Sequence, residues 1–284
     1  MQVLKVGILG AGTMGKQLAL LCSSHGLSTV LWSYRINPNF EKEFARIIQI
    51  QTKLGTVSKD VAEAVTNKIN YTHNIGELRD CDVIIEAVAE NITIKIAVLN
   101  ELASVIDSTK IVASNTSTLS ITLLASLFSD PSRFVGMHFF NPPMSMKLVE
   151  VIKGEHTSDE TVADVIEFLN VLHKNPVELP ETPGFVVNRL LFPLINEAIF
   201  LLAEGISDAK IIDSCMKLGA NHPMGPLELA DLIGLDVCLS ILETLVAETG
   251  DGKYRPAPLL KKYVRAGKLG KKTGIGFYSY RKKG

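Results

Sequence analysis

Two side chains of types that move protons, His138 and Glu150, stand twelve residues apart. A carboxylate bonded to an imidazole fixes its tautomer and stabilises the imidazolium, which a proton shuttle needs. His138 ends the apolar run Phe134–His138 and is followed by Phe-Phe-Asn-Pro-Pro. We therefore expect it near the carboxyl end of a strand, where open α/β sheets bind ligands. Taken alone, such a pair is most often a structural hydrogen bond.

Two further polar segments favour chemistry over structure. Residues 114–118, Ser-Asn-Thr-Ser-Thr, follow the apolar run Ile111–Ala113, so we expect them at the same edge of the sheet as His138. The alternative is an N-cap cluster for a helix that begins near Leu119. Residues 183–189, Pro-Gly-Phe-Val-Val-Asn-Arg, place Asn188 in the first turns of an apolar helix. A buried amide there needs hydrogen-bond partners, and a reacting oxygen is one candidate.

A glycine-rich loop opens the chain. Residues 10–15, Gly-Ala-Gly-Thr-Met-Gly, fit G-x-G-x-x-G between the predicted strand Val3–Leu9 and a helical pattern. Gly10 permits the tight turn, Gly12 lets the backbone approach a pyrophosphate, and Gly15 lets helix and strand pack closely. The helix N-terminus offers N–H groups and a positive dipole to phosphates. The order of strand, loop, helix and second strand predicts a dinucleotide site.

The end of the second predicted strand bears on which dinucleotide binds. A site specific for NAD normally places Asp or Glu there to bind the ribose hydroxyls. This chain has Ser33, with Arg35 two residues later. Without the carboxylate a 2′-phosphate is not repelled, and an arginine can pair with it through two hydrogen bonds. NAD(H) and NADP(H) both stay open, with NADP(H) slightly favoured; the alternative is a solvated Arg35 and a Ser33 that caps a loop.

Short apolar, β-branched runs alternate with helical patterns through the first half of the chain. Strands that are apolar throughout, separated by amphipathic helices, form a parallel sheet covered on both faces. The pattern therefore predicts a Rossmann-type, doubly wound, mostly parallel α/β domain. The predicted strands are Val3–Leu9, Thr29–Trp32, Val83–Ala87, Ile111–Ala113, Phe134–His138 and Leu148–Ile152.

Two stretches of the sequence depart from this alternation of strands and helices and indicate how the domains are organised. The stretch from about Pro38 to Asn67 is helical and longer than a usual connection, which predicts a helical pair that projects from the sheet. After Pro180 and Pro183 strand signals end and helices follow. We expect a dinucleotide-binding domain over 1–182 and an all-α domain over 183–284. The apolar helices of the second domain predict a homodimer.

Composition excludes several classes of protein. The 284 residues are 46% hydrophobic and 21% charged, an ordinary globular composition. Lys and Arg total 29 against 30 Asp and Glu, so no overall field attracts nucleic acid or an anionic membrane. The four cysteines lie far apart, which predicts reduced thiols and neither a disulfide framework nor a zinc or other metal site. They are Cys22, Cys81, Cys215 and Cys238.

Targeting and membrane signals are not expected. A strand pattern that begins at Val3 leaves no room for a signal peptide, so we expect a cytoplasmic protein. The most apolar long stretch, 184–205, is interrupted by polar and charged residues and is predicted to be a buried helix.

Together these motifs resemble the 3-hydroxyacyl-CoA dehydrogenase family, and within it the single-function bacterial 3-hydroxybutyryl-CoA dehydrogenases. The resemblance runs essentially from end to end. It is carried by the glycine loop, Ser-Asn-Thr-Ser at 114–117, His-Phe-Phe-Asn-Pro at 138–142, the segment 183–189, Asn-His-Pro-Met-Gly-Pro at 221–226 and Gly-Phe-Tyr at 276–278. The combination of the His segment, Glu150 twelve residues later and the Pro-Gly-Phe segment is specific.

The resemblance implies an oxidoreductase of fatty acid or butyrate metabolism that interconverts (3S)-3-hydroxyacyl-CoA and 3-oxoacyl-CoA, with short chains favoured. It implies that His138 takes the hydroxyl proton and that Glu150 supports His138. Ser117 and Asn188 would bind the reacting oxygen or the thioester side of the substrate. The hydride chemistry belongs to the cofactor.

The resemblance also implies contacts to the two ligands. Besides the glycine loop, positions that match dinucleotide contacts are Met14, Glu90, Lys95, Asn115, Asn141 and Lys272. For Glu90 and Lys95 the alternative is an exposed ion pair at a helix start, worth little. The family holds coenzyme A against the helical pair, where this chain keeps Lys53 as the best candidate. A solvated helix end is the alternative for Lys53.

Two rival functions remain to be weighed. The β-hydroxyacid dehydrogenases share the glycine-rich start and a helical second domain, but they use a lysine as the acid–base group and lack the His-Phe-Phe-Asn-Pro segment. A non-catalytic structural or dinucleotide-sensing protein on the same fold is the other alternative. Every proposed catalytic position is chemically intact, which disfavours it.

Overall fold

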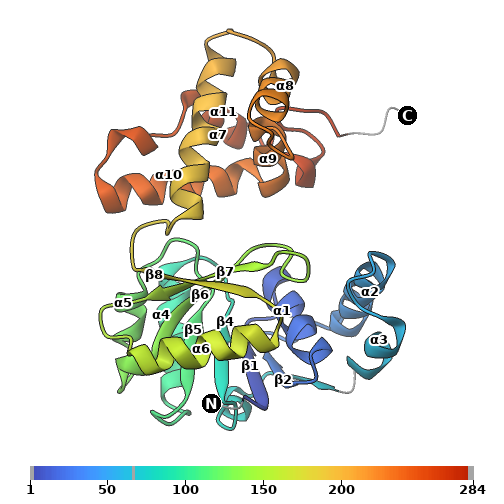
Figure 1. Cartoon of the computed structure of the whole chain (residues 1–284), viewed down its shortest axis with the longest axis vertical. Coiled ribbons are helices and arrows are strands. Elements are labelled where there is room, and N and C mark those ends of the chain that lie inside the picture. Colours follow the sequence, from blue (N-terminus) through green and yellow to red (C-terminus); the bar gives the residue numbers. More distant parts are fainter. Residues whose placement is uncertain (1–2, 66–67, 281–284) are drawn as a thin grey trace. The chain divides into compact units, whose positions relative to one another are not determined.

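A computed structural model describes residues 3–65 and 68–280 (Figure 1). The chain divides into two compact units, Met1–Thr182 and Pro183–Gly284. The first unit is built on a sheet and the second is helical.

The first unit contains an eight-stranded sheet in the order β3-β2-β1-β4-β5-β6-β7-β8. Neighbouring strands from β3 to β6 pair in parallel, β6 pairs antiparallel with β7, and β7 pairs in parallel with β8. The predicted mostly parallel, doubly wound sheet is thereby confirmed. The strands are β1 Lys5–Leu9, β2 Ser28–Trp32, β3 Ile69–Thr72, β4 Val83–Glu86, β5 Ile111–Ser114, β6 Phe134–Phe139, β7 Leu148–Lys153 and β8 Asn175–Pro180.

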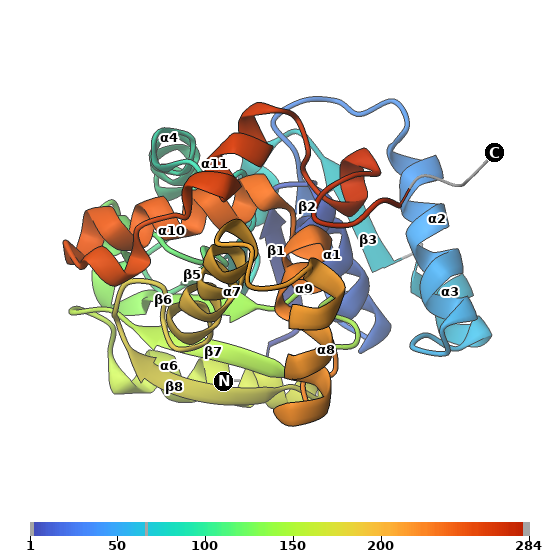
Figure 2. The ribbon, with the colours of Figure 1, turned by 90° about the horizontal axis from the view of Figure 1, so that it is seen from above.

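Helices cover both faces of this sheet, because alternate strand residues point to opposite sides. Val6, Val83 and Val135 belong to one cluster with residues of α1 (Thr13–Ser24) and α6 (Asp159–Val171). On the other face, α4 (Ile92–Ala103) and α5 (Ile121–Ala125) pack against each other. Figure 2 shows α4 and α6 on opposite sides of the strands.

The projecting helical pair is confirmed. It consists of α2 (Phe40–Lys53) and α3 (Lys59–Val65), which Figure 2 shows beside the β3 edge of the sheet. The Phe40 ring stacks on the Tyr71 ring with centroids 3.8 Å apart, and Lys16 of α1 forms an ion pair with Glu43. Asn67, the expected end of the stretch, lies outside the described residues.

Two strands were not predicted. β3, with the sequence Ile-Asn-Tyr-Thr, is only partly buried along the sheet edge. β8 contains Pro176 and Pro180 and is mostly exposed. Proline lacks the N–H that a central strand must donate, but an edge strand tolerates it. Both strands lie at the edges of the sheet, where the buried apolar run that marks a central strand is not required.

The second unit is an α-helical bundle around one apolar cluster that includes Phe192, Ile199, Leu242 and Leu260. Its longest helix begins at Val187, within the stretch that was predicted to be a buried helix. The helices are α7 Val187–Ala203, α8 Ala209–Gly219, α9 Pro226–Ile233, α10 Leu235–Thr249 and α11 Pro258–Arg265. Short 3₁₀ turns in the two units are η2 Ile75–Leu78, η3 Pro131–Arg133, η4 Gly252–Tyr254 and η5 Lys271–Thr273.

Two buried carboxylates join segments of the second unit by accepting hydrogen bonds from backbone N–H groups. Asp213 of α8 accepts hydrogen bonds from the N–H groups of Leu227 and Glu228, at 2.8 and 2.9 Å, and so caps the start of α9. Asp231 accepts the N–H groups of Phe277 and Tyr278, at 3.0 and 2.9 Å. The carboxylates thus join α8 to α9, and α9 to the last described segment of the chain.

Three of the four cysteines are buried. Cys22, Cys81 and Cys238 are buried, and burial raises the pKa of each thiol to about 12, whereas Cys215 is exposed. Within the ranges 3–65 and 68–280, no helix combines the length and apolarity needed to span a bilayer.

Candidate active site

Glycine is required at each of the three positions of the first loop for a different physical reason. Gly10 has φ +119°, and a Cβ there would lie 2.8 Å from the backbone oxygen of Ala87 at the end of β4. A Cβ on Gly15 would lie 1.7 Å from the carbonyl oxygen of Gly10. A Cβ on Gly12 would meet no atom within 4 Å, and no side chain caps the helix that Gly12 precedes. The open space before an uncapped helix N-terminus fits a dinucleotide pyrophosphate.

Ser33 and Arg35 lie directly after β2, beside this loop. The Gly10 N–H donates to the carbonyl of Trp32 at 2.9 Å, which joins the glycine loop to the end of β2. The Ser33 hydroxyl donates to the carbonyl of Arg35 at 2.8 Å, and the Arg35 side chain is exposed. The segment 33–39 contains no Asp or Glu.

His138 and Glu150 are paired across the antiparallel ladder. The register sets His138 of β6 opposite Glu150 of β7, and His138 Nδ1 lies 2.7 Å from Glu150 Oε2. Both residues are buried, at 6% and 1% exposure. A carboxylate only accepts, so Nδ1 carries the proton and Nε2 is left with its lone pair. The geometry is that of an oriented imidazole base.

The segment after β5 meets the end of β6. Asn115 accepts the N–H of Phe139 at 2.9 Å, which ties the loop to the residue after His138. Ser117 donates its N–H to Glu90 Oε1 at 2.8 Å. The alternative of an N-cap cluster at 114–118 is not observed, because α5 begins at Ile121 and its cap is Ser120. Thr116 instead accepts the N–H of Leu119 in the turn before the helix.

Glu90 and Lys95 do not form an exposed ion pair, so that alternative was wrong for Lys95. The Lys95 side chain is 1% exposed, and its ammonium lies 3.2 Å from Glu90 Oε2 and 2.6 Å from Glu86 Oε1. Burial would raise the pKa of Glu90, but the Lys95 charge and hydrogen bonds from Thr116 and Ser117 outweigh it and lower that pKa.

Sequence reasoning missed Glu86 and Gln17. Glu86 ends the buried strand Val-Ile-Ile-Glu, and a charge in an otherwise apolar strand was the available signal. Gln17 of α1 donates to the side-chain oxygen of Asn141 at 3.1 Å. This bond links the first helix to the segment that follows His138.

The remaining predicted residues lie elsewhere in their units. Lys53 is exposed at the last residue of α2. In the second unit, Asn188 is buried in the first turn of α7 at 6% exposure, and Lys272 forms an ion pair with Asp236. Of these three, Asn188 lies where the sequence predicted, in the first turn of an apolar helix.

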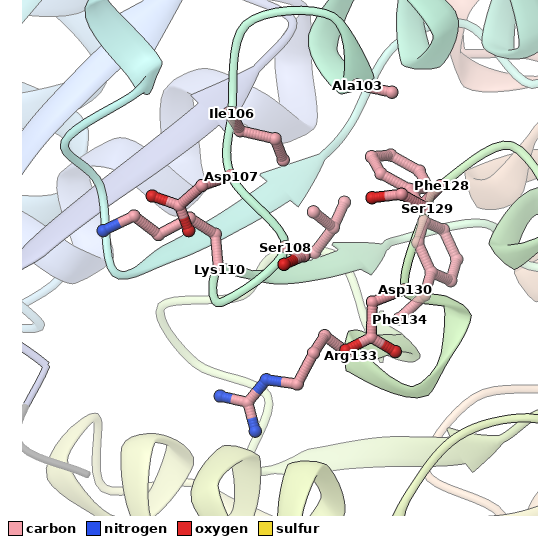
Figure 3. Close-up of a pocket in the computed structure, with 11 residues that line it drawn as sticks. Ala103, Ile106, Asp107, Ser108, Lys110, Phe128, Ser129, Asp130, Arg133 and Phe134 are labelled. Atoms are coloured by element: carbon pink, nitrogen blue, oxygen red, sulfur yellow. The ribbon is translucent and has the colours of Figure 1, made fainter.

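One small cavity lies at the other ends of β5 and β6, far along the strands from Ser114 and His138. Its lining includes Lys110, Ser108, Asp130 and Arg133 (Figure 3). Its volume of about 20 Å³ is room for one water-sized molecule. An acyl-CoA or a dinucleotide does not fit there.

A doubly wound sheet, an opening glycine loop and a buried His–Glu pair at the carboxyl edge define a nicotinamide-dinucleotide oxidoreductase domain. Residues 5–182 match the model of the 3-hydroxyacyl-CoA dehydrogenase NAD binding domain, and residues 184–280 match that of the C-terminal domain. The chain belongs to the 3-hydroxyacyl-CoA dehydrogenase family.

Similar proteins cover the chain almost completely. It is 44% identical to a probable 3-hydroxybutyryl-CoA dehydrogenase of Bacillus subtilis, over 100% of this chain and 99% of that protein. It is 46% identical to a 3-hydroxybutyryl-CoA dehydrogenase of Clostridioides difficile, over 98% and 100%. The crystal structure of (S)-3-hydroxybutyryl-CoA dehydrogenase from Ralstonia eutropha superposes with a TM-score of 0.92 at 42% identity, over 99% and 100%.

Substitutions in the glycine loop should separate binding from folding. Gly12→Ala puts a methyl group into open space, so we expect a melting temperature within about 3 °C of wild type but dinucleotide binding weaker by about tenfold or more. Gly15→Ala forces a contact with Gly10 and should cost about 1–3 kcal/mol of stability. Calorimetry gives both the melting temperatures and the dissociation constants. Unchanged binding by Gly12→Ala would contradict the assignment of this loop.

Proposed function

We propose that this protein interconverts (3S)-3-hydroxyacyl-CoA and 3-oxoacyl-CoA, with 3-hydroxybutyryl-CoA and acetoacetyl-CoA as the short-chain pair. The observation that carries the proposal is the buried 2.7 Å bond between His138 and Glu150, at the same edge of the sheet as the glycine loop that follows β1. The printed names of the bacterial relatives support the substrate. When bound, the dinucleotide supplies the hydride exchange at C3 of the substrate.

His138 is the general base in the oxidation and the general acid in the reduction. Its Nε2 accepts the proton of the 3-hydroxyl group, because Nδ1–H is already donated to Glu150. Glu150 holds the ring in that tautomer and offsets the charge of the imidazolium that forms. Since both residues are largely shielded from water, their mutual attraction is stronger than it would be at the surface.

Other residues bind and orient the two ligands in this proposal. Ser117 and Asn188 donate hydrogen bonds to the reacting oxygen or the thioester oxygen of the substrate. Lys53 pairs with a phosphate of coenzyme A. The glycine loop with Met14 receives the pyrophosphate, and further dinucleotide contacts come from Glu90, Asn115, Asn141 and Lys272. Lys95, whose side chain is 1% exposed, acts on the dinucleotide through its ion pair with Glu90.

Loss of the base should be severe. His138→Gln removes the Nε2 lone pair in a side chain of similar size, so we expect kcat to fall by about 10³-fold with dinucleotide affinity nearly unchanged. Initial rates with acetoacetyl-CoA and a binding titration measure the two quantities. As a comparison, Glu150→Gln should lower kcat without unfolding the protein, because the amide still meets Nδ1. A mild loss in His138→Gln would exclude His138 as the shuttle.

We further propose a preference for NADP(H). The support is the segment 33–39, which has no carboxylate to repel a 2′-phosphate and exposes the Arg35 guanidinium after β2. The Ser33 hydroxyl supplies a second hydrogen bond when its O–H turns from the Arg35 carbonyl, to which it donates in this structure, and donates to the phosphate instead.

This preference is measured as kcat/KM for NADPH against NADH with acetoacetyl-CoA. A charged hydrogen bond is worth about 1.5–3 kcal/mol, so we expect NADPH to be favoured by about 10- to 100-fold. Ser33→Asp restores the carboxylate and should reverse the preference, whereas Lys53→Gln should leave the ratio unchanged. A strong preference of the wild type for NADH would leave Arg35 without this role.

We propose that the protein is a homodimer through its helical unit. Large apolar side chains are exposed on this unit, including Leu190 at 71%, Ile206 at 68% and Leu218 at 88%. Light scattering at micromolar concentration should give twice the 30.9 kDa mass of the chain. Leu218→Glu places a charge on this surface and should raise the dissociation constant. A monomeric wild type would contradict the proposal.

A further inference from the structure

Glu86 is a buried charge that the proposed mechanism does not use. It is the last residue of β4 and has 0% exposure. Its carboxylate accepts both a 2.6 Å and a 2.8 Å bond from the Lys95 ammonium, the hydroxyl of Ser114 and the N–H of Val88 at 2.7 Å. Both oxygens of the Glu86 carboxylate therefore have hydrogen-bond partners, which come from α4, from the loop after β4 and from β5.

Lys95 is not needed at this place for packing. Its neighbours on the buried face of α4 are apolar, as Val98, Leu99 and Leu102 show. An apolar side chain of similar length would pack there without the cost of removing an ammonium and a carboxylate from water. The free energy of folding therefore does not account for this buried ion pair, and its role lies in the groups that its geometry holds in place.

The Lys95 ammonium reaches from Glu86 to Glu90. Its Nζ lies 3.2 Å from Glu90 Oε2. The other oxygen of Glu90 accepts the Thr116 hydroxyl at 2.6 Å and the N–H groups of Ser117 and Thr118 at 2.8 and 3.3 Å. The hydroxyls of Ser117 and Thr118 lie 3.2 and 3.3 Å from the same oxygen. One carboxylate oxygen thus organises the whole segment 116–118.

Glu90 needs help to stay in this position. Its side chain is 38% exposed, so it has room to turn toward water, whereas Lys95 is 1% exposed and Glu86 is 0% exposed. Burial acts to raise the pKa of Glu90, and the Lys95 charge together with the hydrogen bonds from Thr116 and Ser117 lowers it, so the ionised form of Glu90 depends on Lys95. In the series of contacts from Glu86 through Lys95 to Glu90, Glu86 is the residue that is fully buried and held in place.

We propose that Glu86 is a positioning residue that sets Ser117 in the active site by holding Lys95, and through Lys95 the Glu90 carboxylate. The role of Ser117 rests on the proposed function. Glu86 itself touches no substrate in this proposal. Its contribution is that a three-residue segment at the sheet edge is already ordered before the ligands arrive, which lowers the cost of binding the transition state.

A pair of compensating substitutions tests this role. Glu86→Gln and Lys95→Met each leave a buried charge without its main partner, so each should lower the melting temperature by about 10 °C. The double variant removes both charges, and its melting temperature should return to within about 3 °C of wild type. The double variant thus keeps the stability of the wild type but lacks the Lys95 ammonium that contacts Glu90.

The decisive readouts are amide hydrogen exchange of residues 116–118 in the ligand-free protein and kcat. In the double variant we expect exchange to be about tenfold faster and kcat to be about 10- to 100-fold lower, with a small change in KM. If exchange stays slow, or if kcat recovers together with stability, the ion pair is structural and the proposal is overturned.

Two control variants distinguish a loss of stability from a loss of order at residues 116–118. Asp213→Asn weakens a buried carboxylate of the second unit, so it should lower the melting temperature without faster exchange at 116–118 and without a change in kcat at 25 °C. Glu86→Asp keeps the charge but shortens its reach, and should give intermediate exchange in a folded protein even if the double variant does not fold. A wild type that turns over no 3-hydroxyacyl-CoA would refute the proposed function, whereas the exchange experiment would still test the hold of Glu86 on the segment.

Discussion

The reversal of strand direction between β6 and β7 is the constraint on which the site depends. Directly opposite residues of an antiparallel pair lie about 5 Å apart, so the register by itself brings His138 to Glu150. If β7 ran parallel to β6, a crossover would be needed and this short connection would not suffice. The twelve-residue spacing therefore lets the connection 140–147 return the chain beside β6 and set Glu150 opposite His138.

Around that pair, the carboxyl edge of the sheet gathers polar groups that are costly to bury and are hydrogen-bonded to one another. Glu86 ends β4, Ser114 ends β5, and Asn115 accepts the N–H of Phe139 at the end of β6. The glycine loop lies against the end of β4 through Gly10 and Ala87. Hydrogen bonds thus join the end of β4 to the end of β5, and the end of β5 to the end of β6.

The second unit shows that a motif can be specific for a family and still serve packing. A Cβ on Gly225 would lie 2.2 Å from the Asp213 side chain, and a Cβ on Gly276 would lie 1.9 Å from Asp231 Oδ1. Glycine at these two places lets a buried carboxylate reach the backbone N–H groups that it bonds. Two of the segments that carried the resemblance therefore stabilise the bundle in the first instance.

The sequence by itself determined the fold class, the glycine loop, the projecting helical pair and the central strands, because these depend on local pattern: apolar runs, turn glycines and helical spacing. It did not reveal β3 and β8, since edge strands carry no buried apolar run. It offered a Glu90–Lys95 ion pair only as an exposed alternative to dinucleotide contacts, and it missed Glu86. Only the tertiary structure decided that Lys95 is buried and which carboxylates it joins, because burial and charge pairing depend on strands and helices distant in sequence.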